Sequence, residues 1–213
     1  MKVRTEARRT AILQAAAELF QEKGYERASI NELVRRCGGS KQTVYGYFPS
    51  KEALFMAVVQ EVATGHLPEA VEEIRGRDGA HADLEEQLTR FGERMMGVLA
   101  NDARAMAVYR MVIAESGHSD AGRLFDESGP AQLIDAIASL FADAIERGEL
   151  RRVDPKALAQ QFGALLTSET SNRLYQRDPL PVPLDEIRRM VRRAVETFLY
   201  GAAPRSRAVP PAR

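Results

Sequence analysis

Residues 37–54 read CGGSKQTVYGYFPSKEAL, and this stretch is the most informative part of the sequence about the fold. Two glycines follow Cys37, and Pro49 ends the short segment after them, because the residue before a proline avoids the helical region. Val44 and Phe48 are apolar and four residues apart, so they share one face of a helix and would be buried. The opposite face carries polar and aromatic side chains that a core helix does not need. The stretch therefore predicts a short helix with an exposed, functional face.

Two further helices are predicted before this segment. Residues 4–23 carry apolar side chains at helical spacing, and Gly24 follows them as a left-handed stop. A second helix begins at Ser29, whose hydroxyl can cap the amide of Glu32 while the carboxylate of Glu32 reaches back, a capping box. The two glycines of the quoted stretch end this helix and leave only a tight turn. Two helices joined in this way predict a helix-turn-helix, whose second helix enters the major groove of DNA.

The exposed face of the short helix has the chemistry needed to read DNA. Lys41 can donate to guanine, Gln42 can bond adenine through two atoms, and the methyl group of Thr43 suits thymine. Tyrosine and serine hydroxyls suit phosphate oxygens, which set the register of a protein on DNA without reading its sequence. A lysine at position 51 can neutralise another phosphate, so binding should weaken steeply with salt. The residues predicted to contact DNA are Ser29, Ser40, Lys41, Gln42, Thr43, Tyr45, Tyr47 and Lys51.

Charge is unevenly distributed along the chain. The formal net charge is zero, which taken alone argues against a nucleic-acid partner. In residues 1–60, however, basic side chains outnumber acidic ones by four, and the remainder is acidic by the same amount. A basic head on an acidic body is typical of a DNA-binding protein with a separate sensing region. The alternative is a chance asymmetry.

The rest of the chain also has a helical period, and no run alternates as a strand would, so an all-α fold is predicted. Ser50 is expected to cap a long fourth helix with Val58 and Val62 among its inward residues. The stretch 116–130 is expected to be looser, with a short helix at best. Further helices are predicted over about residues 82–101, 103–115, 130–147, 155–172 and 184–200.

Several protein classes are excluded or disfavoured by composition. No apolar run approaches the ~20 residues of a membrane span, and the first ten residues lack the apolar core of a secretory signal. The single cysteine, Cys37, excludes an internal disulfide framework and fits a reducing compartment. We therefore expect a cytoplasmic protein without a membrane partner.

An enzyme is the rival class, and the sequence does not favour it. The three histidines, His66, His81 and His118, are far apart and lack metal-ligand spacing. There is no G-x-S-x-G elbow, no phosphate-cradling glycine loop and no dinucleotide fingerprint. Glu115 lies three residues before His118, but without a nucleophile this pair is expected to be part of a polar loop. We predict a non-enzyme without cofactor, metal or catalytic residues.

Two C-terminal helices have the pattern of a dimer interface. Residues 184–200 present a broad apolar surface that could serve both an internal core and a partner helix, and residues 155–172 carry a similar stripe. Two such helices from each chain would form a four-helix interface about a two-fold axis. A dimer of this kind would hold two reading helices roughly 34–36 Å apart and require a pseudo-palindromic operator. An ordinary monomer core is the alternative.

The run 12–55 resembles the N-terminal DNA-binding region of the TetR/AcrR family of bacterial transcriptional regulators. It has the family's A-x-x-L-F first helix ending in G-Y, the serine start of the second helix, the glycine turn and the sequence S-x-x-T-V-Y-x-Y-F-x-S-K-x-x-L. The resemblance covers about a quarter of the chain and implies DNA contacts from the eight residues named above. Gly39 departs from the family, which usually has an apolar residue there. Gly46 stands where many members have a bulky side chain, so no base contact is carried over to it.

The resemblance implies a helix-turn-helix DNA-binding domain at residues 1–48 and a larger helical ligand-binding and dimerisation domain at 49–201. Residues 202–213 have too little apolar surface to bury and are expected to be a disordered tail. Segments between residues 109 and 166 resemble, less specifically, the C-terminal region of AefR-like members. Repression is the family's commoner mode. A helical small-molecule-binding or scaffold protein without DNA-binding activity is the alternative function.

The sequence also indicates candidate ligand contacts on the central helices of the larger domain. Methionines adapt to irregular ligands, and a pocket usually combines apolar walls with a few polar anchors such as Arg110. The alternative at each position is an ordinary core residue, which is the more common role of such side chains. The apolar bias favours a small hydrophobic or aromatic effector, which would act through the fourth helix. The candidate residues are Met95, Met96, Leu99, Met106, Tyr109, Arg110, Ile113, Phe141, Phe162 and Leu166.

Overall fold

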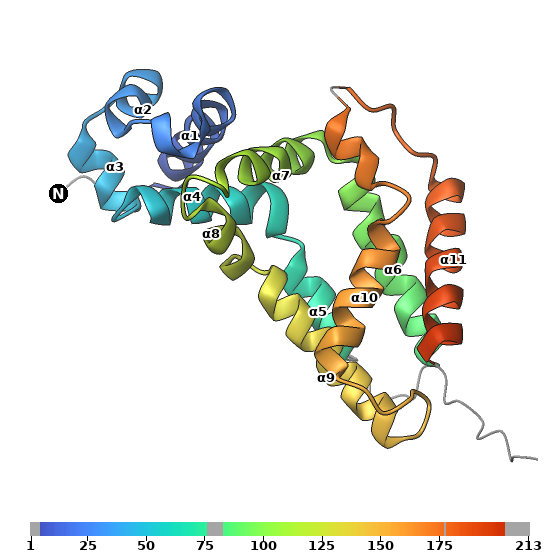
Figure 1. Ribbon diagram of the computed structural model, residues 1–213. Helices are drawn as coiled ribbons and strands as arrows, with labels where there is room; N and C mark the ends of the chain where they lie inside the picture. The colour runs from blue at the N-terminus through green and yellow to red at the C-terminus, as the bar shows by residue number, and fades with distance from the viewer. Residues whose placement is uncertain (1–4, 76–82, 177, 203–213) are drawn as a thin grey trace, which may run out of the picture. The chain divides into compact units, whose positions relative to one another are not determined.

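The computed structural model describes residues 5–75, 83–176 and 178–202 of the 213-residue chain. Within these ranges every regular element is a helix (Figure 1), which confirms the predicted all-α class. The chain divides into two compact units. We call Met1–Pro68 with Asp102–Ala131 the head unit, and Glu69–Asn101 with Gln132–Arg213 the body unit.

The head unit contains six α-helices and one π-helix among its described residues. Its core joins apolar side chains from α1, α2, α3, α4, α7 and α8, so α4, α7 and α8 pack with the three N-terminal helices. The domain boundary at residue 48, which the family resemblance implies, stays a prediction. The elements are α1 (Glu6–Arg27), α2 (Ile30–Cys37), α3 (Lys41–Tyr47), α4 (Lys51–Val59), η1 (Gln60–Thr64), α7 (Ala103–Glu115) and α8 (Ala121–Glu127).

Serine side chains begin three successive helices in this unit. The hydroxyl of Ser29 accepts from the backbone nitrogen of Glu32 at 3.2 Å, and Ser40 and Ser50 cap α3 and α4 in the same way at 3.1 Å. Such a cap stabilises a helix by about 1 kcal/mol. The second half of the predicted capping box is replaced, since the carboxylate of Glu32 accepts from Arg36 at 3.1 Å.

Gly24 breaks α1 as predicted, although one more helical turn follows it. Its φ of 76° is left-handed, and the helix bends there before it ends at Arg27. Beyond the bend, the ring of Tyr25 lies 4.8 Å from Phe55 and 6.0 Å from Phe20, measured between ring centroids. Full burial of such side chains contributes about 1.5–3 kcal/mol each. The aromatic cluster therefore fixes the first helix against α4.

The predicted fourth helix changes geometry midway. After Val59 it widens into the π-helix η1, and a Cβ at Gly65 would lie only 2.6 Å from the carbonyl oxygen of Gln60. Thr64, at the end of the wide turn, is buried and donates its hydroxyl to the carbonyl oxygen of Ser128 at 3.1 Å. Short π segments often mark functional sites.

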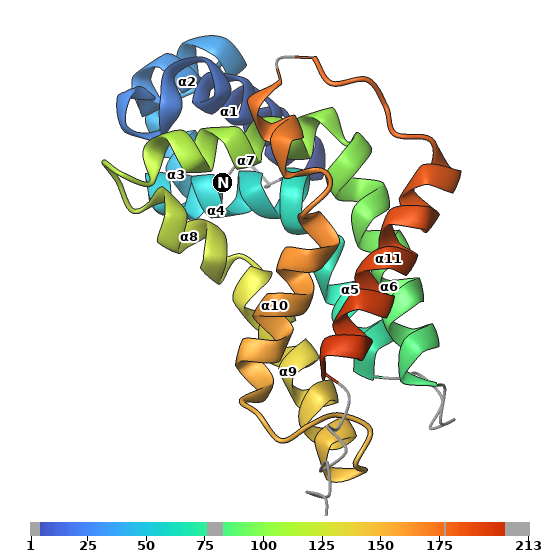
Figure 2. The same ribbon diagram turned by 45° about the vertical axis from the view of Figure 1, so that its right-hand side comes forward.

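The body unit is built from long helices, and α11 packs against both α6 and α10, as Figure 1 and Figure 2 show. Four phenylalanines form its centre, with ring centroids 4.9–6.2 Å apart: Phe91, Phe141, Phe162 and Phe198. The elements are α5 (Leu67–Arg75), which begins at the boundary between the units, α6 (Leu84–Asn101), α9 (Pro130–Glu146), α10 (Pro155–Thr167), the 3-10 helix η2 (Ser171–Tyr175) and α11 (Leu184–Ala202).

Most predicted helix bounds in this unit agree with the structure to within a few residues. The helix predicted over 155–172 is shorter, because α10 ends at Thr167 and η2 follows. The amide of Asn101 holds the proline-rich segment beyond η2 by exchanging two hydrogen bonds, of 3.0 and 2.8 Å, with the backbone of Val182. The predicted tail lies outside the described residues except for Ala202. Among the helices described, none combines the length and hydropathy required to cross a bilayer.

Candidate nucleic-acid interface

The short helix α3 turns its apolar pair inward and its polar side chains outward. Val44 is fully buried and Phe48 nearly so. Lys41 and Gln42 are exposed in the first turn, and Tyr45 is 44% exposed on the next. This is the orientation that a reading helix needs, because base edges are contacted from the N-terminal turn.

The side-chain hydroxyls of Ser29 and Ser40 cap the N-termini of α2 and α3. Ser40 accepts from the backbone nitrogen of Thr43 and also lies 3.0 Å from the hydroxyl oxygen of Thr43. Ser29 is exposed and caps α2. A hydroxyl that accepts a capping bond can still donate its own proton. Both serines can therefore donate to a phosphate oxygen without leaving their helices.

Tyr47 connects α3 to the start of the described chain. Its hydroxyl accepts a hydrogen bond from the backbone nitrogen of Thr5 at 2.9 Å and lies 3.4 Å from the carbonyl oxygen of the same residue. Thr5 is also the N-cap of α1. The structure thus shows Tyr47 joining α3 to the start of α1, and a phosphate contact from it stays a prediction.

Lys51 lies against the segment between α1 and α2. Its Nζ donates to the carbonyl oxygen of Glu26 at 2.9 Å and lies 4.6 Å from the ring centroid of Tyr25. An ammonium group has three donors, so this bond leaves capacity for another acceptor. The Lys51 side chain therefore stabilises the segment that precedes α2. The phosphate contact predicted for it stays a prediction.

The sequence interpretation missed Arg8. Its guanidinium donates to the carbonyl oxygen of Cys37 at 2.7 Å and to that of Gly38, so it satisfies the end of α2 from α1. Gly38 and Gly39 have φ values of 72° and 93°, and a Cβ at Gly39 would lie 2.7 Å from Nη2 of Arg8. This explains the departure from the family pattern at Gly39. No local spacing marks Arg8, because its partners are 29 and 30 residues away.

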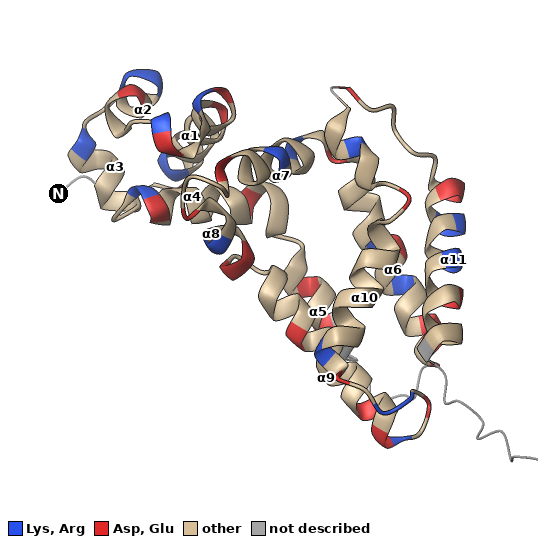
Figure 3. Cartoon of the chain, viewed as in Figure 1, with Lys and Arg blue, Asp and Glu red and all other residues tan. Residues whose placement is uncertain are grey.

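Some of the basic side chains of the head unit are neutralised within it. Arg36 donates to both carboxylate oxygens of Glu22, at 3.0 and 2.6 Å, and also bonds Glu32. The hydrogen bond from Arg36 lowers the pKa of Glu22. Lys41 and Arg35, by contrast, make no ion pair with any residue that the structure describes. Figure 3 shows how basic and acidic residues are distributed along α1, α2 and α3. Among the described residues, positive charge is therefore left without an ion pair in the last turn of α2 and at the start of α3.

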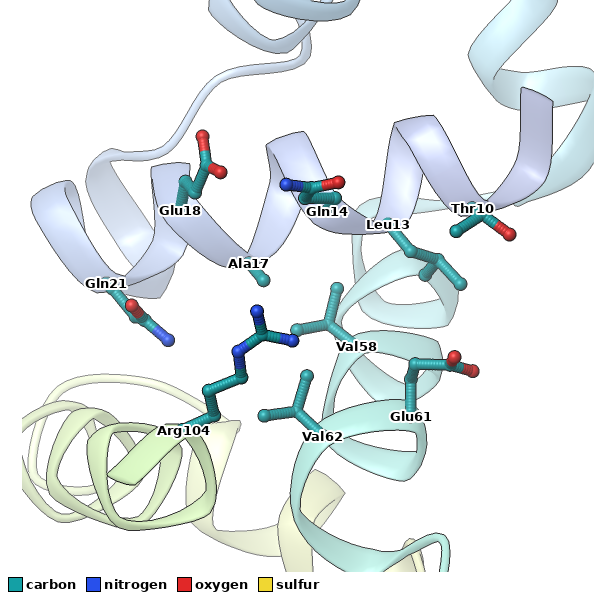
Figure 4. A pocket seen from close by; sticks show the side chains of 10 residues that line it. All are labelled: Thr10, Leu13, Gln14, Ala17, Glu18, Gln21, Val58, Glu61, Val62 and Arg104. Atoms are coloured by element: carbon teal, nitrogen blue, oxygen red, sulfur yellow. The ribbon is translucent and has the colours of Figure 1, made fainter. Parts of the chain in front are cut away.

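A groove of about 250 Å³ lies within the head unit, between α1, α4, η1 and the start of α7 (Figure 4). Arg104 reaches into it from α7 toward the apolar side chains of Val58 and Val62. None of the ten predicted ligand contacts lines it. Its lining residues are Thr10, Leu13, Gln14, Ala17, Glu18, Gln21, Val58, Glu61, Val62 and Arg104.

The structure divides the predicted ligand contacts between the two units. Four lie on α7, where Met106 is buried, Tyr109 and Arg110 are half-buried and Ile113 is 58% exposed. Burial raises the pKa of the Tyr109 hydroxyl to about 12. The other six belong to the core of the body unit or its margin: Met95, Met96, Leu99, Phe141, Phe162 and Leu166.

No metal-binding cluster of three or more His, Cys, Asp or Glu side chains occurs among the described residues. Cys37 is half-buried at the end of α2, and its Sγ lies 3.9 Å from Nη2 of Arg8. It forms part of the contact between α1 and α2.

Two family models match the chain in the regions just described. The model for bacterial regulatory proteins of the tetR family matches residues 12–58, which run from α1 into α4. The model for the C-terminal domain of AefR-like transcriptional repressors matches residues 86–202. The second match alone spans more than half of the chain.

Individual relatives agree with these matches. The HTH-type transcriptional regulator UidR of Escherichia coli strain K12 is 39% identical over 77 residues, which are 35% of this chain and 39% of UidR. The chain thus spans only about two fifths of the length of this curated relative.

Solved structures cover far more of the chain. A TetR-family transcriptional regulator from Mesorhizobium loti is 27% identical, with a TM-score of 0.75, and the match covers 95% of this chain and all of that one. The flavonoid-responsive regulator FrrA is 27% identical over the same shares, with a TM-score of 0.69. Together with the two family models, these similarities show that the chain belongs to the TetR family of bacterial transcriptional regulators and has the DNA-binding and AefR-like C-terminal domains of that family.

Proposed function

We propose that the protein is a ligand-responsive repressor that binds a pseudo-palindromic operator as a homodimer and is released by a small hydrophobic or aromatic ligand. The observation that supports DNA reading most directly is the orientation of α3. Val44 and Phe48 anchor the helix, while Lys41 and Gln42 project from its exposed first turn. A regulator of this kind acts where the chromosome is, so we propose a cytoplasmic location.

In this proposal the side chains of α3 have separate roles. Lys41 and Gln42 read base edges in the major groove, and Thr43 contacts a thymine methyl group. Tyr45 donates to a phosphate oxygen and sets the register. The eight predicted contact residues thus divide into three that read bases and five that bind phosphates: Ser29, Ser40, Tyr45, Tyr47 and Lys51.

We propose that the dimer forms through the helices at residues 155–172 and 184–200. The apolar stripe of α11 is already buried within the body unit, since Ile187 and Val191 are almost inaccessible to solvent. The partner must therefore meet the outward face of α11, where Arg192 is exposed and Tyr200 is 92% exposed. Tyrosine and arginine are enriched at protein interfaces, which supports this assignment.

The proposed effector binds to the domain formed by residues 49–201. A similar protein, FrrA, is described as flavonoid-responsive, and this supports an aromatic ligand here. The residues that we propose for contact are the ten named above, of which Tyr109 and Arg110 offer polar groups on α7. A ligand lowers DNA affinity only if it binds one conformation better than the other.

Selection from a pool of random duplexes tests the proposal. The full-length protein should retain a pseudo-palindromic duplex selectively, and its affinity should fall steeply as salt rises. The double variant Lys41→Ala with Gln42→Ala should lose selectivity but keep its melting temperature. Folded dimer that retains no duplex at low salt would instead favour the scaffold alternative, and retention of an asymmetric half-site would contradict the dimeric reading.

A further inference from the structure

Glu115 is the last residue of α7, a position where a negative charge is disfavoured by the helix dipole. Its carboxylate accepts a hydrogen bond from the backbone nitrogen of Glu26 at 3.1 Å, although the two residues are 89 positions apart. Glu26 belongs to the single helical turn beyond the bend at Gly24. Nitrogens at the start of such a turn have no partner within it. Glu115 therefore caps this turn from another helix.

Gly24 leaves the space that the carboxylate occupies. A Cβ at Gly24 would overlap Oε1 of Glu115, and the left-handed φ of 76° would strain any other residue there. The glycine is thus required both by its own backbone and by its neighbour on α7. The sequence predicts Gly24 as a helix stop and Glu115 as a polar residue at the end of the helix over 103–115, and neither prediction includes this contact.

The same peptide segment is held from a second side. The carbonyl oxygen of Glu26 accepts from Nζ of Lys51, which is the first residue of α4. The backbone of Glu26 is therefore bonded to α7 through its nitrogen and to α4 through its oxygen. Residues 24–28, which we call the corner, lead directly into Ser29, the cap of α2. Whatever orients the corner also orients the start of the helix-turn-helix.

We propose that Glu115 is a positioning residue for DNA binding. Through its contact with the corner, the position of α7 determines the orientation of α2 and α3 relative to α1. This inference rests on the proposed function. The helix that ends in Glu115 also carries four proposed effector contacts, among them Tyr109 and Arg110. An effector that displaces α7 withdraws the carboxylate from Glu26, and the conformation without this bond has the lower affinity for DNA.

The first measurement is amide hydrogen exchange in the full-length protein without DNA. Glu115→Ala should accelerate exchange in the corner, because the backbone nitrogen of Glu26 loses its acceptor. Glu115→Gln should restore protection, because an amide oxygen can accept the same bond. Glu127→Ala is the matched control, since Glu127 is an exposed carboxylate of the same unit that pairs with Arg123 on its own helix. Unchanged exchange in Glu115→Ala would overturn the proposed contact.

The second measurement is affinity for the duplex that the wild-type protein selects from the random pool. Glu115→Ala should bind this duplex about tenfold more weakly, the effect of one hydrogen bond to a charged group. Glu115→Gln and Glu127→Ala should bind within about twofold of wild type. The comparison is made at a temperature at which thermal melting shows every variant to be folded, so a general loss of stability cannot produce the difference.

The two measurements separate the possible failures. Faster exchange in Glu115→Ala with unchanged affinity would show that the bond forms but does not position the reading helix, and this overturns the proposal. Failure of the wild-type protein to select any duplex would overturn both the proposed function and the positioning role. In that case the exchange data would still show whether Glu115 caps the corner.

Discussion

The guanidinium of Arg8 donates to the carbonyl oxygen of Cys37 at 2.7 Å, so the first helix closes the end of the second. This contact bridges 29 residues of sequence and lies directly before the turn that leads to α3. Replacement of Arg8 by Ala should leave two carbonyl oxygens without this partner and destabilise the protein by about 1–3 kcal/mol. Denaturant unfolding measures the loss. Arg35→Ala is the control, because the exposed Arg35 makes no ion pair among the described residues, and it should change stability by less than about 0.5 kcal/mol.

Gly39→Ala should be destabilising for two reasons. Its φ of 93° is unfavourable for an alanine, and the new Cβ would lie 2.7 Å from Nη2 of Arg8. We expect a loss of about 1–3 kcal/mol in the free energy of unfolding. Gly97→Ala provides the contrast, because a Cβ at this position in α6 meets no atom of the described residues within 4 Å. That variant should gain up to about 1 kcal/mol from helix propensity. Equal effects of the two substitutions would contradict the conformational argument.

Single substitutions on α3 should separate base reading from phosphate binding. Lys41→Ala or Gln42→Ala should relax the preference at particular base pairs by about 1–3 kcal/mol per contact. Binding to a set of duplexes that differ at one position each measures this change. Tyr45→Phe should instead weaken binding to all of them similarly, because the lost hydroxyl is proposed to contact a phosphate. A loss confined to certain sequences would move Tyr45 to the base-reading group.

The stability of the folded protein at alkaline pH should depend on the ionisation of Tyr109. Burial raises the pKa of its hydroxyl to about 12, above the ordinary value of 10.0. Below pH 10 both the folded and the unfolded forms keep the proton, so the stabilisation is fully present. As pH rises from about 10 to 12, only the unfolded form loses the proton, and stability should fall by up to about 2–3 kcal/mol.

Chemical unfolding across this pH range, compared between wild type and Tyr109→Phe, isolates the contribution of Tyr109. The variant should show a shallower alkaline loss of stability than wild type. Identical pH profiles would mean that the Tyr109 hydroxyl reaches solvent in the folded protein.

Local features of the sequence were sufficient for most of the fold. Serine caps, a glycine stop and apolar spacing act within a few residues, so they placed α2, α3 and the first part of α4 closely. The inward pair Val44 and Phe48 also follows from spacing alone. These features are readable because the helix period links residue spacing to direction.

The contacts that were missed join residues far apart in sequence. Arg8 with Cys37, Tyr47 with Thr5 and Glu115 with Glu26 all depend on how helices pack. Nothing in a local window distinguishes Arg8 from its basic neighbours. The candidate DNA-contacting residues could be chosen from the sequence. The hydrogen bonds that Tyr47 makes to Thr5 and Lys51 makes to Glu26 could not be predicted, since each depends on a partner brought close by the fold.

The π turn at Gln60–Thr64 changes the direction in which the side chains after it face. Before it, burial repeats in ordinary α-helical steps. Across it, Val59 and Thr64 are both buried although they are five residues apart, whereas Val62, expected inward, is only half-buried. A π turn holds one residue more than the standard spacing, so side chains beyond it face about 100° away from an unbroken spiral. Any alignment or redesign of this segment therefore has to count one inserted residue before it assigns inner and outer positions.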